Sequence, residues 1–420
     1  MDIKRLYPIL LIIFTNILGA GVILPVLPLY AEVQFQGTVP QITLLSSAFF
    51  GAQFLAAPWL GRLSDRYGRR PLLIISQIGT VAAFILFIFA GPLGERIDAL
   101  GFNLPLTGGM VMLFVARILD GITGGNITIA QAYVSDVTPD ENRAQGLGLL
   151  QAAFGAGFVF GPAFGGILGN YGPIMPFIGA VIVTVATLLL TVFTLEESLS
   201  PEERSENLTT GGRPRLPLSV ALREQTLLLM LAIGFLSSLA FSSLPATFSL
   251  FADHVVFAQA ANQDRITLYI GLMLAFLGIA QVITQLRLVR PLVEKYGERR
   301  LLILGDVVLL VSFWLLAVFS DAITVTLLLG AFAFGTGVSE PTMQALVTRF
   351  GGRNMRGHLL GLYQSARSLA LIGGPILAGW LYEDFFPQAV FLAGAVVMAL
   401  ALLGAVMLLN REISPIEAQI

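Results

Sequence analysis

RAQGLGLLQAAFGAGFVFGPAFGG (residues 143–166) has a second copy in the same chain, RGHLLGLYQSARSLALIGGPILAG (residues 356–379), and this pair decides the fold. The two stretches align without a gap, so that an arginine, a glutamine and a Gly-Pro step recur in register. A shorter repeat, DRYGRRPLLI (65–74) and EKYGERRLLI (294–303), relates the same two parts of the chain. The repeats indicate that one ancestral unit was duplicated.

The composition is that of a membrane protein. The chain has 420 residues, of which 56% are hydrophobic and only 12% charged, and its mean hydropathy is +0.83. A helix needs about 20 mostly apolar residues to cross a bilayer. We therefore predict an all-α polytopic membrane protein with twelve transmembrane helices in two six-helix halves. The predicted spans cover residues 6–31, 40–60, 71–92, 108–134, 145–169, 172–194, 225–252, 266–289, 301–320, 322–348, 356–382 and 387–410.

A polar segment separates the two predicted halves. Between the sixth and seventh spans the chain reads EESLSPEERSENLTTGGRPRLPLSVALREQ, which is charged and interrupted by glycine and proline. Such a composition is typical of a linker. The predicted domains are an N-terminal half at 1–195, a cytoplasmic linker at 196–224 and a C-terminal half at 225–420.

The basic residues predict the orientation. Most of the 24 Lys and Arg residues fall in alternate loops on one side of the predicted bundle, and short cytoplasmic loops accumulate these residues. Both termini are therefore expected to be cytoplasmic. The first apolar run follows MDIKR without a cleavage site and continues for a full span, which is typical of a retained first helix. The expected location is the cell membrane, most consistent with a bacterial inner membrane.

Charge and composition exclude several classes of function. The formal net charge of −2 does not favour a nucleic acid partner, and two histidines with no cysteine exclude disulfides and argue against a metal site or cofactor. An intramembrane enzyme needs clustered nucleophiles, metal ligands or a phosphate loop, and the sequence has none of these patterns. From another class, a non-transporting receptor or scaffold stays as an alternative, although the short loops leave no room for a sizeable soluble domain. We expect a monomer.

Three motifs resemble those of the major facilitator superfamily. GRLSDRYGRR (61–70) resembles its loop between helices two and three, RILDGITGG (117–125) its helix-four motif, and GAGFVFGPAFGG (155–166) the helix-five motif of proton-driven exporters. The resemblance covers almost the whole chain. It is closest to the tetracycline/proton antiporter branch of twelve-helix drug exporters, through GAGVILPVLP (19–28) and APWLGRLSDRYGRRP (57–71). It implies parallel halves that alternate access to a site between them.

The first motif has both a functional and a topological interpretation. Glycines permit a tight reversal, and an aspartate suits a helix N-terminus, where arginines are able to brace it. The resemblance implies a latch that closes the cytoplasmic ends of the halves when the cavity faces outward. Alternatively, the arginines only set the topology. The predicted cytoplasmic gate comprises Gly61, Asp65, Arg66, Gly68 and Arg69.

The second copy of this motif is weaker. In EKYGERRLLI a glutamate replaces the aspartate, and Arg290 stands in place of the first glycine. We therefore expect the first copy to be the working latch and the second to be its eroded duplicate.

The helix-five motif carries small residues at three- and four-residue spacing. Such a face lets a neighbouring helix approach closely, and a proline loosens the helix there. The resemblance adds that this contact seals against proton leak, whereas generic helix packing is the alternative. The residues of this antiporter motif are Gly157, Gly161, Pro162, Gly165 and Gly166.

Ionisable residues within spans are costly and indicate function. Arg117 and Asp120 are three residues apart on one helix face and are expected to pair near mid-membrane. Glu340 and Arg367 lie at similar depths in two consecutive spans, which predicts a buried salt bridge between neighbouring helices. All four are candidates for proton coupling, and for both pairs a static structural role is the alternative.

Polar and aromatic residues on inward-facing helices are candidates for contact with the substrate. Each of them is alternatively a helix-to-helix hydrogen bond. A mostly apolar cavity suits a hydrophobic or amphipathic molecule better than a sugar. The candidates are Asn16, Gln53, Asn126, Gln151, Phe154, Gln281, Gln344 and Gln364.

The sequence departs from the tetracycline branch at its acidic sites. Asn16 stands where those proteins carry an acid, and the positions of three further acidic or histidine sites correspond here to Ala83, Gln281 and Leu309. Asp306 lies one turn from the last of these, near the expected cytoplasmic end of its span, where it is able to snorkel or to cap the helix. These departures point to Asp120 and Glu340 as the acids of the proton route.

The sequence predicts a secondary active transporter that exports a hydrophobic or amphipathic drug-like molecule in exchange for protons. The alternative within the same superfamily is an uncoupled facilitator or a carrier of lipids or metabolites. The expected partners are the small-molecule substrate, protons and the lipid bilayer.

Overall fold

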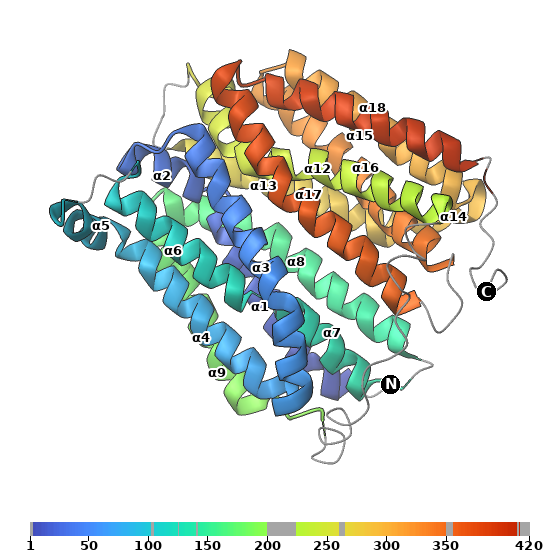
Figure 1. Ribbon diagram of the computed structural model, residues 1–420, viewed down its shortest axis with the longest axis horizontal. Helices are drawn as coiled ribbons and strands as arrows, with labels where there is room; N and C mark the ends of the chain where they lie inside the picture. The colour runs from blue at the N-terminus through green and yellow to red at the C-terminus, as the bar shows by residue number, and fades with distance from the viewer. Residues whose placement is uncertain are drawn as a thin grey trace. The chain divides into compact units, whose positions relative to one another are not determined.

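A computed structural model describes residues 3–101, 105–124, 126–139, 142–199, 224–259, 265–349, 356–409 and 411. All regular secondary structure in these ranges is helical (Figure 1). The chain divides into two compact units. Unit 1 comprises Met1–Gly211 and Ala260–Ala275, and unit 2 comprises Gly212–Gln259 and Phe276–Ile420.

Unit 1 is built from the helices of the first half of the chain. These are α1 (Ile3–Ile23), α2 (Leu27–Phe35), α3 (Val39–Tyr67), α4 (Arg69–Ile88), α5 (Ala90–Ala99), α6 (Gly108–Thr123), α7 (Asn126–Val137), α8 (Arg143–Gly169) and α9 (Met175–Thr194). The beginning of α13 (Ile266–Ile283) also belongs to this unit.

Unit 2 is built from the helices of the second half. It contains α12 (Gln225–Phe251), η2 (Ala252–Val256), the end of α13, η4 (Thr284–Leu288), α14 (Val289–Tyr296), α15 (Glu298–Val318), α16 (Ala322–Arg349), α17 (Arg356–Asp384) and α18 (Ala389–Leu409).

Eleven helical segments among the described residues are long and apolar enough to cross a membrane. Each overlaps one of the predicted spans. The segment that corresponds to the eleventh predicted span is α17, which has 29 residues but is not among these eleven. Its middle carries Ser365, Arg367 and Ser368, which lower its hydropathy.

Proline and glycine explain where the helices break. The first membrane segment runs over Leu6–Phe35 but is interrupted between α1 and α2 at Pro25, because proline has no amide hydrogen to continue the helix. The predicted loop at 61–70 is wrong. Helix α3 continues to Tyr67, and the reversal into α4 takes place at Gly68 alone, whose φ of 106° is accessible to glycine.

The same helix pairings recur in both units. In unit 1, α1 packs on α8 and α9, and α4 packs on α6 and α9. In unit 2 the equivalent helices pair in the same way, since α12 packs on α17 and α18, and α15 packs on α16 and α18. The duplication that the sequence repeats indicated is therefore present in the packing.

The repeat extends to single side chains at the helix ends. The Arg70 guanidinium donates to the carbonyl of Val192 near the end of α9 at 2.6 Å. In unit 2, Arg299 donates to the carbonyl of Leu409, the last residue of α18, at 2.9 Å. Both arginines occupy the same position in the shorter repeat, at 65–74 and 294–303. Each of them connects the start of one helix to the end of another.

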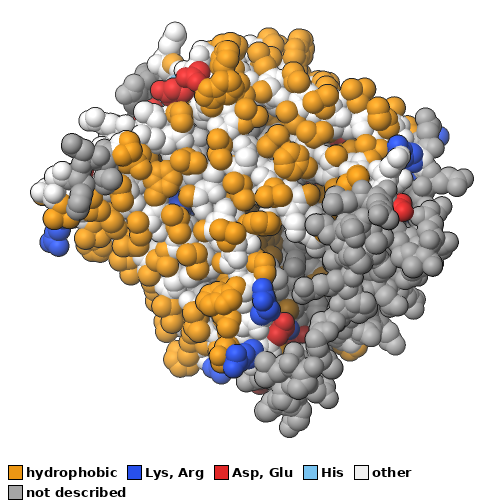
Figure 2. All heavy atoms as spheres, in the orientation of Figure 1, with side chains coloured by type: hydrophobic (Ala, Val, Ile, Leu, Met, Phe, Trp, Pro, Cys, Tyr) orange, Lys and Arg blue, Asp and Glu red, His pale blue; other side chains and the backbone are white. Residues whose placement is uncertain are grey.

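Hydrophobic side chains cover much of the face in view, where Lys, Arg, Asp and Glu side chains are few (Figure 2). Large apolar side chains such as Leu55 and Phe193 are about four-fifths exposed, at 78% and 81%. In water such a surface would be a liability. It is what lipid requires, and it agrees with a multi-pass membrane protein.

Asp321 lies directly before the membrane segment Ala322–Arg349 and caps the N-terminus of α16. The backbone N–H of Thr324 donates to Oδ1 of Asp321 at 2.9 Å. Hydrogen bonds from Thr324 hold the pKa of Asp321 below its usual value. Asp321 is therefore an ordinary, solvent-exposed carboxylate and a useful reference for the acidic residues inside the spans.

Candidate functional site

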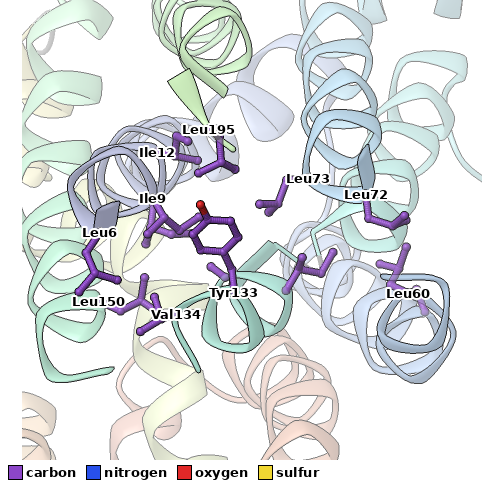
Figure 3. Close-up of a cluster of buried hydrophobic side chains, with 14 residues drawn as sticks. Leu6, Ile9, Ile12, Leu60, Leu72, Leu73, Tyr133, Val134, Leu150 and Leu195 are labelled. Carbon is purple, nitrogen blue, oxygen red and sulfur yellow. The ribbon is translucent and has the colours of Figure 1, made fainter. Parts of the chain in front are cut away.

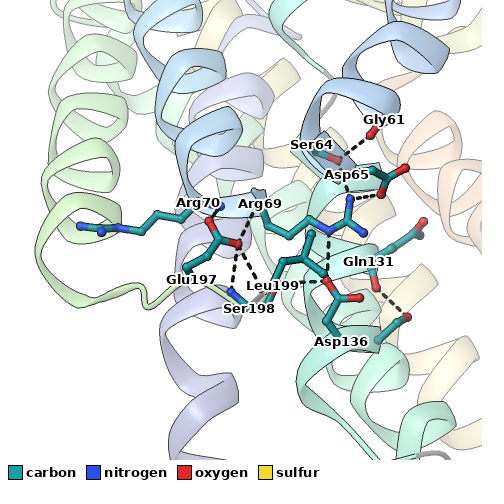
Figure 4. Close-up of polar contacts among 11 residues, drawn as sticks. Gly61, Ser64, Asp65, Arg69, Arg70, Gln131, Asp136, Glu197, Ser198 and Leu199 are labelled. Atoms are coloured by element: carbon teal, nitrogen blue, oxygen red, sulfur yellow. Dashed lines mark hydrogen bonds and ion pairs between the residues drawn. The ribbon is translucent and has the colours of Figure 1, made fainter. Parts of the chain in front are cut away.

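A charged cluster in unit 1 joins the ends of three helices to the segment after α9. Its centre is the Arg69 side chain, which is only 8% exposed (Figure 4). This guanidinium bonds Asp65 at 2.5 Å and Asp136 at 3.0 Å, and it also donates to the hydroxyl of Ser64 at 2.6 Å. One arginine thus holds the end of α3, the start of α4 and the end of α7 together.

The acid at the N-terminus of α4 is Glu197, and the predicted helix-end role of Asp65 is wrong. The Glu197 carboxylate accepts the backbone N–H groups of Arg69 at 2.8 Å and Arg70 at 3.2 Å. These N–H groups have no partner within the helix, so a carboxylate there satisfies them and complements the helix dipole. The Ser198 hydroxyl donates to Asp136 at 3.0 Å. The start of the predicted linker is therefore part of the cluster.

The other members of the predicted gate have lesser roles in this geometry. Gly61 lies inside α3, and a Cβ built there meets nothing within 4 Å. The guanidinium of Arg66 stacks on the neighbouring Tyr67 ring at 5.2 Å. Gly68 makes the turn. The cluster is thus built by Asp65 and Arg69 from the motif, together with Asp136 and Glu197 from outside it.

An apolar cluster supports the charged one (Figure 3). The apolar residues lie a few positions away in sequence from the charged ones. Leu73 of α4, Tyr133 of α7 and Leu195, which directly follows α9, are all almost fully buried. Their burial holds the helix ends in fixed positions. The charged side chains therefore lie close together without a further rearrangement of the backbone. The labelled cluster consists of Leu6, Ile9, Ile12, Leu60, Leu72, Leu73, Tyr133, Val134, Leu150 and Leu195.

The glycine face of α8 lies against α1. A Cβ built at Gly157, Gly161 or Gly165 would overlap the backbone of α1, so these positions admit no side chain in the present packing. Gly166 faces the other way, toward Gly271 at the start of α13. The prediction that this face allows close helix approach is confirmed.

Arg117 and Asp120 form the predicted ion pair on α6. Their nearest charged atoms are 3.6 Å apart, and both side chains are about nine-tenths buried. The guanidinium also lies over the ring of Phe49 of α3, 4.9 Å from its centre. The side chain of Asp120 also has a hydrogen bond with Thr80. The enclosed surroundings favour a structural role for the pair, whereas the long ionic contact favours rearrangement.

Glu340 and Arg367 form the second predicted ion pair, at 2.5 Å. The pair lies in unit 2 between α16 and α17, with side chains 29% and 20% exposed, so it is less buried than the sequence indicated. Two amides predicted as substrate contacts belong to its surroundings. Gln344 donates to Glu340 at 2.6 Å, and Gln364 accepts from Arg367 at 3.2 Å.

The Glu340–Arg367 pair lines a cavity of about 90 Å³ in unit 2. Hydroxyl groups of α12 and α16, the phenol of Tyr363 and the amide of Gln281 share this cavity with apolar side chains. The Arg367 Nε also donates to the Ser238 hydroxyl at 3.2 Å. The cavity is lined by Ile233, Gly234, Ser237, Ser238, Phe241, Gln281, Leu302, Leu309, Thr336, Ser339, Glu340, Met343, Tyr363 and Arg367.

The other predicted substrate contacts belong to unit 1. Asn16 is buried in α1, Gln53 donates to the backbone of Gly124 at 2.9 Å, and Phe154 packs on the apolar cluster of unit 1. Gln151 is exposed on α8. The side chain of Asn126 lies outside the described residues.

Asp306 is placed differently from the sequence prediction. It neither snorkels nor caps, because its side chain is completely buried between helices. The Ser339 hydroxyl of α16 donates to its Oδ1 at 2.9 Å. Sequence reasoning also missed Asp136, Glu197 and Ser339. Only Asp136 had a visible signal, as an acid at the end of a predicted span, and the other two become apparent through packing.

The chain matches a known protein family over almost its whole length. The model of the Major Facilitator Superfamily matches residues 9–285 and 266–419. The chain is 30% identical to the class H tetracycline resistance protein of Pasteurella multocida over 407 residues, which is 96% of each protein. It is also 30% identical to multidrug resistance protein 2 of Bacillus subtilis (strain 168), covering 94% of this chain and 93% of that one.

A solved structure has the same fold. The human organic anion transporter MFSD10 (TETRAN) superposes with a TM-score of 0.68 at 22% identity, covering 96% of this chain and 99% of the other. At that identity the likeness concerns the fold alone.

Proposed function

Because the chain belongs to the Major Facilitator Superfamily of membrane transporters, we propose that it exports a hydrophobic or amphipathic drug-like molecule in exchange for protons, by alternating access. Relatives named for resistance to tetracycline and to multiple drugs support a substrate of this class. The family and the fold point to a transporter and not to an enzyme.

The observation that carries the proposal is the Glu340–Arg367 pair at the wall of the unit 2 cavity. An ion pair within membrane-spanning helices is costly and is retained where it serves a function. A proton on Glu340 would remove its attraction to Arg367. A charged or polar group of a substrate that enters the cavity would compete for the same two side chains. Proton and substrate would then occupy the site alternately, as exchange requires.

Arg117 and Asp120 are the corresponding candidates in unit 1. Their long 3.6 Å contact has few competing partners, so a proton on Asp120 would release Arg117 toward the Phe49 ring that it already contacts. We assign this pair a part in coupling the two units, with the substrate held mainly in the cavity of unit 2.

The topology belongs to the same proposal. We infer that α17 also spans the membrane, which brings the number of spans to twelve, because its packing on α12 matches that of α8 on α1. With twelve spans and the basic loops inside, both termini are cytoplasmic. The two halves then run over residues 1–195 and 225–420, the charged cluster of unit 1 is the cytoplasmic gate, and the protein works as a monomer.

A pH gradient tests proton coupling. Purified protein is reconstituted into proteoliposomes, and uptake of ethidium and of tetracycline is followed with an acidic lumen and with equal pH on both sides. We expect an acidic lumen to drive accumulation of a probe, and a protonophore to abolish it. Equal transport with and without the gradient would reject proton coupling in favour of an uncoupled facilitator.

A further inference from the structure

Asp306 is a carboxyl group buried inside a membrane segment without a charged partner. It lies in α15, and its side chain is 0% exposed. Oδ1 accepts the Ser339 hydroxyl at 2.9 Å, whereas Oδ2 is buried and has no hydrogen-bond partner in the part of the chain that the structure describes. No ion pair of Asp306 occurs among the described residues.

Two glycines allow the close helix crossing that buries Asp306. A Cβ at Gly305 would collide with the Ser339 hydroxyl, and a Cβ at Gly335 would collide with Leu309. Helices α15 and α16 therefore cross closely at this point. The crossing brings the Asp306 carboxyl against Ser339 and closes it off from lipid and solvent.

Few basic side chains on the helices around Asp306 are available to pair with its carboxylate. Helix α18, which packs on α15, has no titratable side chain. On α16 the titratable residues are Glu340 and Arg349, and Arg349 is paired with Glu298 at 2.8 Å. The other charged residues of α15 and of α14 lie at the start of α15 or before it: Glu298, Arg299, Arg300, Arg290, Glu294 and Lys295. Across the cavity stand Tyr363 and Arg367, and Arg367 is held by Glu340.

We propose that Asp306 is a proton-binding site that exchanges its proton with the unit 2 cavity through the Ser339 hydroxyl. An isolated carboxylate is expensive to bury, whereas the neutral acid needs only ordinary hydrogen bonds. The resting carboxyl therefore holds a proton. Its path to the cavity is short, because Ser339 and Glu340 are adjacent on α16 and both line it.

The exchange is chemically simple. The Ser339 hydroxyl first turns, so that its oxygen accepts a hydrogen bond from the protonated carboxyl of Asp306 and its own hydrogen points to a water molecule in the cavity. It then passes its proton to that water and takes the proton of Asp306, so that serine stays neutral, a hydronium ion forms in the cavity and the carboxylate remains. A cavity of about 90 Å³ is large enough for a few water molecules, each of which occupies about 30 Å³. This role rests on the proposed function and adds a second acid to Glu340.

The protonation state is measurable without transport. Infrared spectra of purified wild type and Asp306→Asn at neutral pH should differ by the carbonyl band of a protonated carboxyl, present in the wild type and lost in the variant. Asp321→Asn is the matched control, because that carboxylate is exposed and already ionised, and it should leave the band unchanged. A band that persists in Asp306→Asn overturns the proposal.

Transport separates this proposal from the proposed function. In proteoliposomes, Asp306→Asn should lose gradient-driven probe uptake while probe exchange at equal pH continues. Ser339→Ala should slow the same driven uptake and keep the infrared band. If the wild type ignores the gradient, the proposed function fails; if the wild type responds and Asp306→Asn responds equally, only the role of Asp306 fails.

Discussion

The two intramembrane ion pairs differ in their surroundings, and this difference decides what each residue is able to do. Arg117 and Asp120 are almost enclosed, so their charges are fixed mainly by each other. Glu340 and Arg367 face a cavity and share their contacts with Gln344 and other polar side chains. When one charge of the Glu340–Arg367 pair is removed, the remaining residue still has polar side chains to contact. Substitutions in this pair therefore test proton coupling with less effect on folding.

Neutralising Glu340 and Arg367 singly and together separates stability from coupling. Each single variant, Glu340→Gln or Arg367→Gln, leaves an unpaired charge and should cost about 1–3 kcal/mol, less than a fully enclosed pair because of partial exposure. The double variant should recover most of that stability and still lose gradient-driven transport. Thermal unfolding in detergent and proteoliposome uptake are the two measurements. Full coupling in the double variant would leave the pair with a structural role only.

Single residues were predictable where spacing alone places them. Arg117 and Asp120 are three residues apart on one helix, and Glu340 and Arg367 match in depth, so both ion pairs followed from counting. The burial of Asp306 did not, because it depends on how closely α15 and α16 cross. That distance is set by Gly305 and Gly335, on two helices whose contact no local pattern reveals.

At the scale of elements, glycine spacing predicts that a helix packs closely against a neighbour. The α8 glycines predicted a close approach, and the structure identifies α1 as the partner. The loop at 61–70 was mispredicted because its charges were taken to end the helix. Charged residues are compatible with the last turns of a helix that leaves the membrane, so only Gly68, with its positive φ, ends α3.

Two valine substitutions in α8 test the packing. In Gly161→Val the new Cβ meets the α1 backbone at Gly21 and Leu18, and overpacking of this kind typically costs about 1–3 kcal/mol. Gly148→Val is the matched control on the same helix, since a Cβ there meets nothing within 4 Å. Thermal unfolding in detergent should show a clear loss for the first variant and little change for the second. Equal losses would mean that helix propensity, not contact with α1, explains the glycine.

At the scale of the whole molecule, the two halves share a plan and differ in charge. The helix pairings repeat, and the Arg70 and Arg299 contacts to carbonyls repeat with them. The arginine at the centre of the unit 1 cluster, Arg69, has Glu298 at its equivalent position, and that glutamate pairs with Arg349 at 2.8 Å. The sequence repeats predicted the shared plan. The ion pairs of Arg69 and Glu298 differ because they depend on tertiary contacts, which the sequence repeats do not predict.

This difference between the halves predicts unequal effects of two equivalent substitutions. Asp65 and Glu294 occupy the same position in the repeat. Asp65 bonds a buried Arg69 that also holds Asp136, whereas Glu294 bonds only an Arg290 that is 89% exposed, a type of pair that contributes little. Asp65→Asn should therefore abolish active efflux while the protein inserts normally, and Glu294→Gln should transport like the wild type.

Both variants need membrane quantity and transport measured side by side. Immunoblots of membranes report insertion, and drug efflux from cells reports activity. Wild-type transport by Asp65→Asn would mean that the unit 1 motif only sets the membrane orientation, because that variant keeps the arginines that do so. Loss of transport in Glu294→Gln would mean that the second copy has kept its function, because an exposed pair has too little effect on stability to explain such a loss. Unequal results place the gate in unit 1, where one buried arginine connects three helices to the segment that leads into the second half.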